Sequence, residues 1–200
     1  VYVATPDKAI FELVSNYGGK AVLSSETHNT GTDRIFEVFK NTLKSLPNII
    51  VNLQGDMPNI EPKIIKNLIN YMQQGKCEVG TLASEIKNNF ELEDENIVKV
   101  LVKEKLKEGI FSEALDFLRV NPGKDHKTYH HVGIYAFTSI ALTKYVSLKR
   151  SKLELNRKLE QLRAMENGMS IHVGYINSSP LSVDTEKDLF RIKKLMERNE

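Results

Sequence analysis

The strongest constraint on the fold is a repeated order of apolar run, polar loop and amphipathic helix. Residues 49–53, Ile-Ile-Val-Asn-Leu, form a nearly continuous apolar run, which is typical of a central strand covered on both faces. A loop follows over residues 54–58. Pro62 then suits the first turn of a helix whose apolar residues recur at helical spacing. This order predicts a three-layer α/β domain around a mainly parallel, mixed sheet.

The same order extends along most of the chain, and we interpret residues 1–200 as a single domain. Thr5 is expected to cap the first helix, and Thr30 with Asp33 has the spacing of a capping box at the start of the second. Residues 84–130 contain a charged segment that is hard to assign, so we expect an excursion from the core there. Further strands are expected at 79–83, 97–102, 131–137, 171–175 and 181–183, with helices at 153–167 and after Thr185.

The charge balance and the cysteine content exclude several classes of protein. Lys and Arg number 28 against 26 Asp and Glu, a net charge of +2, which is too balanced for a non-specific nucleic-acid binder. Cys77 is the single cysteine, so an internal disulfide and a cysteine zinc cluster are excluded. No apolar run could span a membrane and no signal peptide is visible. We therefore expect a cytoplasmic protein without nucleic-acid or membrane partners.

Two acidic residues follow predicted strands, where open α/β sheets bind their ligands. Asp56 comes after the strand at 49–53, and Asp184 comes after residues 181–183 and just before a helix. Two such carboxylates could share one Mg²⁺, whose other ligands would be phosphate oxygens and water. The alternative is that Asp56 is a turn residue and Asp184 a helix-start residue, since aspartate is common in both places.

Three other segments carry candidate ligand contacts, each with a plainer alternative. Thr30, Thr32 and Arg34 combine hydroxyls and a cation at a helix start, which suits a phosphate or a nucleotide edge, but equally an ordinary helix cap. Strand alternation puts His131 and Tyr135 on one face, where they could meet a polar ligand. A lone strand histidine is, however, more often structural. Polar residues on the helix at 153–167, namely Glu160, Gln161 and Arg163, would ordinarily form a solvated face.

The segments with candidate residues belong to a set of motifs that resembles a known family. There is no P-loop, no Gly-x-Gly-x-x-Gly and no Gly-x-Ser-x-Gly in the chain. The motifs, in chain order, are Val3-Ala4-Thr5, His28-x-Thr30-Gly31-Thr32-Asp33-Arg34, Val51-Asn52-Leu53-Gln54-Gly55-Asp56-x-Pro58, His131-x-Gly133-Ile134-Tyr135, Leu159-Glu160-Gln161-Leu162-Arg163 and Val183-Asp184-Thr185-x-x-Asp188-Leu189. In order and spacing they resemble the 3-deoxy-manno-octulosonate (Kdo) cytidylyltransferase family, also called CMP-Kdo synthetases.

The resemblance implies a Rossmann-like nucleotide-diphospho-sugar transferase fold and an enzyme that joins CTP to Kdo, releasing pyrophosphate, for lipopolysaccharide biosynthesis. By position, Asp56 and Asp184 resemble the catalytic Mg²⁺ ligands of the family. Thr30, Thr32 and Arg34 resemble its nucleotide-binding segment. The positions that resemble its sugar-binding residues are Gln54, His131, Tyr135, Glu160 and Gln161. A homodimer is expected as well, with contacts through residues 91–127 and 153–167, partly because two-fold dimers are the commonest assemblies.

Two departures from the family leave alternatives open. The chain opens inside a strand, and the family's N-terminal strand and triphosphate-binding loop are not in it, so an inactive relative is one alternative. The family usually has Phe-Ser-Arg where this chain has Phe111-Ser112-Glu113. If Glu113 points toward the sugar pocket, it repels an acidic sugar, which would favour a related substrate such as an 8-amino Kdo or a sialic-type acid. The other reading places Glu113 on the surface.

Overall fold

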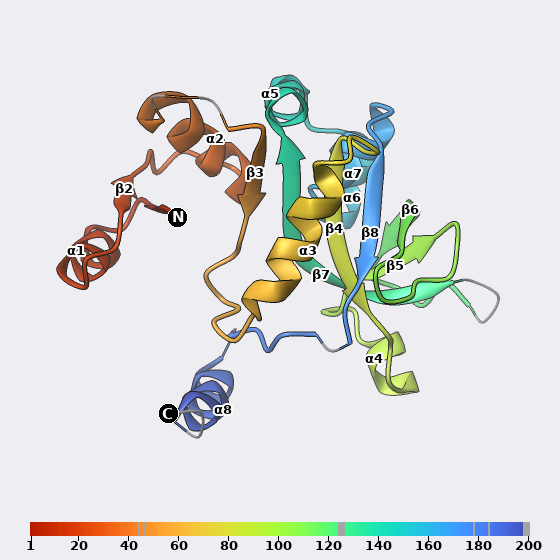
Figure 1. Cartoon of the computed structure of the whole chain (residues 1–200). Coiled ribbons are helices and arrows are strands. Elements are labelled where there is room, and N and C mark those ends of the chain that lie inside the picture. The colour runs from red at the N-terminus through yellow and green to blue at the C-terminus, as the bar shows by residue number, and fades with distance from the viewer. Residues whose placement is uncertain (44, 46, 124–126, 178, 184, 198–200) are drawn as a thin grey trace.

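The computed structural model describes residues 1–43, 45, 47–123, 127–177, 179–183 and 185–197. Its main sheet has the strand order β3-β7-β4-β8-β6-β5 (Figure 1). The strands of this sheet are β3 Ile49–Asn52, β4 Val79–Ser84, β5 Lys99–Val102, β6 Phe111–Leu118, β7 Thr128–Thr138 and β8 Ile171–Tyr175. A separate parallel pair is formed by β1 Val3–Thr5 and β2 Ala21–Leu23.

The sheet is mixed, as expected, but it is not mainly parallel. Strands β4 and β8 pair in parallel, whereas β7 runs antiparallel between β3 and β4. The antiparallel insertion of β7 makes most hydrogen-bonded neighbours antiparallel, although β3, β4 and β8 share one direction. Strand β5 pairs with β6 and also with the start of β7. The strands β4, β8, β6, β5 and β7 therefore follow one another in a closed ring of pairings.

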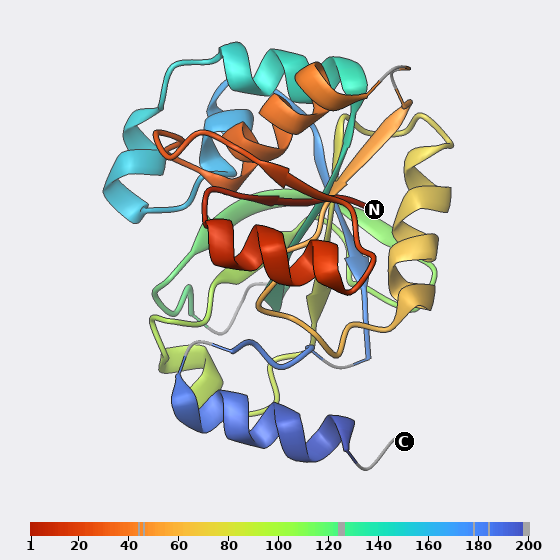
Figure 2. The same cartoon turned by 90° about the vertical axis from the view of Figure 1, so that its left-hand side faces the viewer.

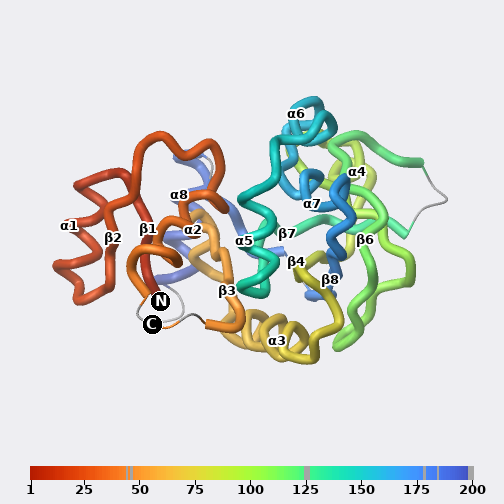
Figure 3. Tube along the Cα trace, turned by 90° about the horizontal axis from the view of Figure 1, so that it is seen from above, coloured from red at the N-terminus to blue at the C-terminus, as the bar shows by residue number. Residues whose placement is uncertain are grey.

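Helices cover both faces of the sheet, which gives the three layers. Helix α3, Pro62–Met72, packs on one face through Leu68 and Met72, against Val132 and Ile134 of β7. The opposite face is covered by α2 Gly31–Thr42, α5 Ser139–Ser147, α6 Lys152–Arg157 and α7 Leu162–Glu166. Figure 3 shows these two sets on either side of β4 and β8. Alternation along β7 thus sends its odd residues into one core cluster and its even residues into the other, as the sequence predicted.

The remaining helices lie at the margins. Helix α1, Lys8–Asn16, packs with β1 and β2, and α4, Asn89–Glu93, precedes β5. Helix α8, Glu186–Met196, lies apart from the sheet, at the bottom of the molecule in Figure 2. No helix among the described residues combines the length and the apolar character needed to cross a bilayer.

Several helix ends differ from expectation. The N-cap of α1 is Asp7 and not Thr5, because Oδ1 of Asp7 accepts hydrogen bonds from the backbone of Ala9 and Ile10. The expected helix at 153–167 is wrong: it is broken into α6 and α7. Lys158 adopts a left-handed conformation with φ 55°, so the chain turns before α7 begins.

The charged middle of the chain takes part in the main sheet. Strands β5 and β6 and the start of β7 lie within residues 84–130, and Val100 and Phe117 are fully buried in the main core cluster. The sequence did not predict strand β6, because Glu113 and Asp116 interrupt its apolar pattern. Glu113 is exposed, and Asp116 forms an ion pair with Arg157.

The strand expected at 181–183 is absent. These residues lie against the loop after β3: the backbone N–H of Leu181 donates to Asn59 Oδ1, and that of Val183 to the carbonyl of Asp56. With side-chain and loop partners in place of a neighbouring strand, no ladder forms.

Candidate functional site

The carboxyl end of β3 opens the candidate site. Asn52, the last residue of β3, is buried, and its Nδ2 has no hydrogen-bond partner among the described residues. This Nδ2 lies 3.8 Å from the point where a Cβ on Gly31 would stand, at the start of α2. A buried amide donor without an acceptor is costly, so this position suits an incoming polar group.

Asp56 lies in the loop that follows. Its Oδ2 accepts a hydrogen bond of 3.1 Å from the hydroxyl of Ser182, and its carbonyl accepts one of 2.9 Å from the N–H of Val183. Oδ1 is buried and has no partner among the described residues. A buried, unpartnered carboxylate oxygen is a fitting ligand for a hard cation such as Mg²⁺. Asp184, the other predicted ligand, lies outside the described residues.

The start of α2 places the three predicted nucleotide-binding residues in different surroundings. Thr30 is the N-cap: its Oγ1 accepts from the N–H of Asp33 and donates to the Asp33 carboxylate. Thr32 is buried and donates a 2.9 Å hydrogen bond to Oε1 of Glu160. Arg34 donates to Ser24 Oγ and to the carbonyl of Ser25. Thr30 and Arg34 therefore order the helix start and the loop before it.

A narrow cavity of about 10 Å³, enough for about one water molecule, brings together four of the predicted residues, Thr32, Tyr135, Glu160 and Gln161. They come from α2, from β7 and from the turn between α6 and α7. Burial raises the pKa of the Glu160 carboxyl, although hydrogen bonds from Thr32 and Thr30 oppose this. The rest of the cavity wall is apolar or aromatic and is made by Val79, Phe137, Tyr145, Ala164 and Ile171.

His131 lies in the core near this cavity. Burial lowers its pKa to about 3, so the imidazole is neutral at physiological pH. The hydroxyl of Thr81 donates to the carbonyl of Ile134 at 2.8 Å, so its oxygen accepts from Nε2–H of His131 at 2.9 Å. This leaves Nδ1 of His131 as the acceptor nitrogen. The ring also meets Tyr135 at 5.4 Å between centroids, in line with the expected shared face.

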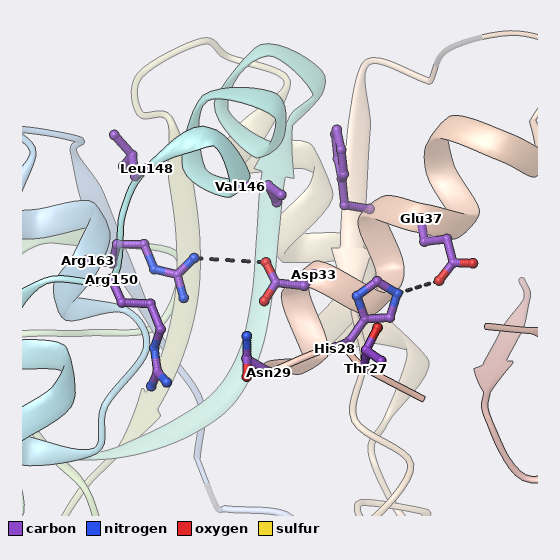
Figure 4. Close-up of a pocket in the computed structure, with 10 residues that line it drawn as sticks. Thr27, His28, Asn29, Asp33, Glu37, Val146, Leu148, Arg150 and Arg163 are labelled. Carbon is purple, nitrogen blue, oxygen red and sulfur yellow. Dashed lines mark hydrogen bonds and ion pairs between the residues drawn. The ribbon is translucent and has the colours of Figure 1, made fainter. Parts of the chain in front are cut away.

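A larger pocket, about 360 Å³, opens on the other side of the α2 start (Figure 4). None of the predicted site residues within the described part of the chain lines it. Asp33 and Arg163 face each other in it, with 3.9 Å between Oδ1 and Nη1, and His28 bonds to Glu37. That hydrogen bond is the main cause of the lowered pKa of Glu37. The pocket has both charge signs, so it does not select a cation or an anion.

Comparison with known proteins identifies the family. A cytidylyltransferase family model matches residues 1–171. The 3-deoxy-manno-octulosonate cytidylyltransferases of Bartonella tribocorum and Paramagnetospirillum magneticum are each 38% identical to this chain, over 97% and 98% of it and 80% of their own lengths. The chain belongs to the 3-deoxy-manno-octulosonate cytidylyltransferase family.

Solved structures agree with this family assignment. A CMP:2-keto-3-deoxy-manno-octonic acid synthetase complexed with CTP superposes with a TM-score of 0.88 and 32% identity, covering 100% of this chain and 81% of its own. The 4-diphosphocytidyl-2C-methyl-D-erythritol synthase of Anaerococcus prevotii has a TM-score of 0.58 at 16% identity, over 96% of this chain and 77% of its own, which shows a shared fold. The predicted nucleotidyltransferase fold and cytidylyltransferase class are thereby confirmed.

Within this cytidylyltransferase, the predicted site residues fall into two groups. Thr32, Tyr135, Glu160 and Gln161 line one cavity, and Asp56 lies after the carboxyl end of β3, where its Oδ1 has no partner in the part of the chain that the structure describes. The others do not line that cavity. Gln54 is exposed, and its Nε2 lies 3.5 Å from the point where a Cβ on Gly133 would stand. Their ligand roles stay predictions.

Sequence reasoning missed residues that hold the site in place. Glu154 and Arg163 form a buried ion pair, although Arg163 sits on a helix face that would ordinarily be solvated. Tyr145 donates from its hydroxyl to the carbonyl of Glu160 at 2.8 Å. Asn52 carried a signal, because a single polar residue in an otherwise apolar central strand needs a partner. The buried pair of Glu154 and Arg163 gave no signal in the sequence, since the spacing of charged residues does not show whether they are buried.

Glu113 lies on the surface, the second of its two alternatives. It forms a 3.5 Å ion pair with Lys103, and the two side chains are 47% and 64% exposed. Its partner across the strands is His172, which bonds to Tyr71 of α3, whereas Tyr135 belongs to the core cluster on the opposite face. Glu113 therefore does not point toward the cavity lined by Tyr135 and Glu160.

Proposed function

We propose that this cytidylyltransferase joins CTP to the sugar acid Kdo, giving CMP-Kdo and pyrophosphate for lipopolysaccharide biosynthesis. The observation that carries the proposal is the cavity in which Thr32, Tyr135, Glu160 and Gln161 meet. These residues come from three distant motifs, and by resemblance they stand at the sugar- and nucleotide-contacting positions of the family. The relatives at 38% identity carry the name of this reaction.

The cavity residues suit a polyhydroxylated substrate. Glu160 offers carboxylate oxygens and Gln161 an amide with both donors and acceptors, so together they pair with sugar hydroxyls. Thr32 already holds Oε1 of Glu160, which orients the carboxylate before a sugar arrives. The aromatic wall around them, with Tyr135 and Tyr145, limits the water that competes for these hydrogen bonds.

We assign Mg²⁺ to Asp56 and, by resemblance, to Asp184. The free, buried Oδ1 of Asp56 supports the assignment, and Ser182 holds the other carboxylate oxygen in place. The described residues contain no group of three or more His, Cys, Asp or Glu side chains that could hold a metal by themselves. This suits Mg²⁺, which takes one or two protein carboxylates and fills its other positions with phosphate oxygens and water. When bound, the metal neutralises charge on the phosphates.

The reaction is a phosphoryl transfer that needs no covalent enzyme intermediate. The anomeric hydroxyl of the sugar attacks the α-phosphorus of CTP, the new O–P bond forms, and the bond to the β-phosphate oxygen breaks with release of pyrophosphate. The hydroxyl proton passes to solvent or to a carboxylate within reach. The protein's contribution is to place sugar and nucleotide in line and exclude water.

Pyrophosphate release measured with each nucleoside triphosphate, with and without Kdo, tests this function. We expect release with CTP and Kdo only, and a rise in the KM for Kdo in Glu160→Gln. Glu12→Gln serves as the matched control, because Glu12 is exposed on α1. Pyrophosphate release with a different sugar acid, and not with Kdo, would make that acid the substrate. No release with any pair, from a folded protein, would favour the inactive relative.

We further propose that the protein is a homodimer. Arg157 of α6 bonds to Asp116 of β6 at 2.7 Å, which joins two elements in the regions expected to carry the contact. Leu115 and Leu155, their neighbours, are both at least half exposed. Exposed leucines on joined elements fit a surface that a second copy covers. Light scattering at micromolar concentration should give the dimer mass, and Leu155→Glu should lower it toward the monomer mass.

We also propose a cytoplasmic location. The single cysteine, Cys77, is free and buried, and burial raises the pKa of its thiol to about 11, so the thiol is unreactive. Fractionation of cells that carry a tagged chain should recover it with cytoplasmic markers, and recovery with membranes or secreted protein would contradict this.

A further inference from the structure

A buried chain of contacts runs behind the turn that carries Glu160 and Gln161. It begins at Glu154, whose side chain is 1% exposed and accepts from Nε and Nη2 of Arg163 at 2.9 and 2.7 Å. The Arg163 guanidinium, 2% exposed, lies over the ring of Tyr145 at 4.6 Å from its centroid. The hydroxyl of Tyr145 then donates to the carbonyl of Glu160.

The same arginine also reaches α2. Its Nη1 lies 3.9 Å from Oδ1 of Asp33, the residue after Thr32, and Thr32 holds the Glu160 side chain. The Glu160 residue is thus fixed at two points: its carbonyl through Tyr145 and its carboxylate through Thr32. Arg163 contacts Tyr145 and Asp33, the neighbour of Thr32, but it does not line the narrow cavity itself.

We propose that Arg163 is a positioning residue for the sugar site, acting through Tyr145 on the backbone of Glu160. This deepens the proposed function, since it rests on Glu160 and Gln161 binding the sugar. A guanidinium is suited to the task because its planar fork bonds Glu154 in two places while its face stacks on an aromatic ring. Lysine offers neither the fork nor the flat face.

The design of the surrounding segment supports a positioning role. Residues 158–161 form a turn between two short helices, and the left-handed Lys158 begins it. Its own hydrogen bonds are local ones within the backbone, such as those from Leu159 N–H to the carbonyl of Glu154 and from Leu162 N–H to the carbonyl of Leu159. The Glu160 carbonyl receives one from the N–H of Arg163, at 3.1 Å, and one from Tyr145. The hydrogen bond from Tyr145 differs from the local ones because it ties the turn to another helix, α5.

Two variants test the proposal, with one matched control. Tyr145→Phe removes the hydroxyl that bonds Glu160 but keeps the ring under Arg163. Arg163→Lys keeps the charge but loses the fork and the stacking. Tyr129→Phe is the control. Tyr129 lies on β7, where it pairs with β5, and it is also buried. Its hydroxyl accepts a hydrogen bond from one backbone N–H, that of Leu106.

The kinetic readout separates positioning from general stability. We expect Tyr145→Phe and Arg163→Lys each to raise the KM for the sugar acid about three- to tenfold, the effect of one hydrogen bond, with the KM for CTP changed less than about twofold. Tyr129→Phe should leave both KM values unchanged. In the double variant the two effects should fail to add, because both act through one contact. Equal changes for both substrates, or full additivity, would overturn the proposal.

A second readout does not need turnover. Amide hydrogen exchange of residues 158–163 should speed up about three- to tenfold in both variants and stay unchanged in Tyr129→Phe. Unchanged exchange in Tyr145→Phe overturns the positioning role whatever the kinetics, also where Arg163→Lys fails to fold. Faster exchange with an unchanged sugar KM overturns it too. A wild-type protein that turns over no sugar acid instead contradicts the proposed function, and the exchange comparison still decides whether Arg163 holds this turn.

Discussion

Ser182 donates a hydrogen bond of 3.1 Å to Oδ2 of Asp56, although 126 positions of the chain separate them. The loop after β3 and the segment before α8 therefore meet at one carboxylate. Ser182 bonds Oδ2, whereas Oδ1 has no hydrogen-bond partner among the described residues. One oxygen of Asp56 thus holds the two loops together, and we propose that the other binds the metal.

Asp56→Asn should therefore abolish most of the activity while the fold persists. We expect kcat to fall about a hundredfold or more, since a metal's charge stabilisation in such a step is worth several kcal/mol. Ser182→Ala should have a smaller effect, because it frees Oδ2 without removing the charge. Pyrophosphate release over a Mg²⁺ titration, with Mn²⁺ binding measured in parallel, checks both. Unaltered Mg²⁺ dependence and Mn²⁺ binding in Asp56→Asn would contradict the assignment.

Glu113→Arg should leave the KM for the sugar acid unchanged within about twofold. The side chain lies on the far face of the sheet and pairs with an exposed lysine. Exposed ion pairs are worth about 0–1 kcal/mol, so the free energy of unfolding should change little. Steady-state kinetics with both substrates and a urea titration measure these quantities. If the KM for the sugar acid instead falls severalfold in Glu113→Arg, residue 113 lies near the bound sugar and this prediction is wrong.

The free energy of unfolding should decrease on acidification through the buried His131. In the folded protein its pKa is about 3, below the ordinary value of 6.5, so between these values the unfolded chain binds the extra proton. Stability from this residue is complete above about pH 6.5 and is lost as the pH falls toward 3, by up to about 1.4 kcal/mol per pH unit. His131→Gln should show a shallower slope in urea titrations between pH 6.5 and 4. Identical slopes would refute the shift.

Gly174→Ala should destabilise the protein more than Gly80→Ala. A Cβ on Gly174 would lie 2.5 Å from two ring atoms of Phe111, which is stacked on Tyr71 at 3.7 Å between centroids and cannot easily move. A Cβ on Gly80 would meet Met72 Sδ at 2.8 Å and Leu68 Cδ1 at 2.9 Å, at the ends of flexible side chains. We expect about 1–3 kcal/mol for Gly174→Ala and less for Gly80→Ala. Urea titration compares them, and the reverse order would contradict this packing.

Local patterns were sufficient to predict most of the elements. The apolar run before Asp56 became β3, and Pro62 begins α3 as expected. The capping spacings at Thr30 and at Thr185 both mark helix starts in the structure. These signals succeed because caps and apolar periods involve residues a few positions apart, so the sequence contains both partners within one short window.

Failures occurred where the deciding partner is distant. Strand β6 carries charges because Asp116 has a partner in α6, Arg157, which is 41 positions away. That partner is not visible in a local window. The same reason explains why the cavity could be approached only through a family resemblance: Thr32 and Glu160 are 128 positions apart.

Lys158 is the only residue other than glycine with positive φ among the described residues. This conformation reverses the helical path at one position, so the register of Glu160 relative to Thr32 depends on the number of residues between Glu154 and Gln161. Most surface loops tolerate an inserted or deleted residue, since their ends can readjust. Here the two ends of the turn are fixed, one by the buried ion pair of Glu154 with Arg163 and the other by the hydrogen bond of Glu160 with Thr32. Among descendants of this chain, we therefore expect the length of this turn to vary less than the lengths of the surface loops.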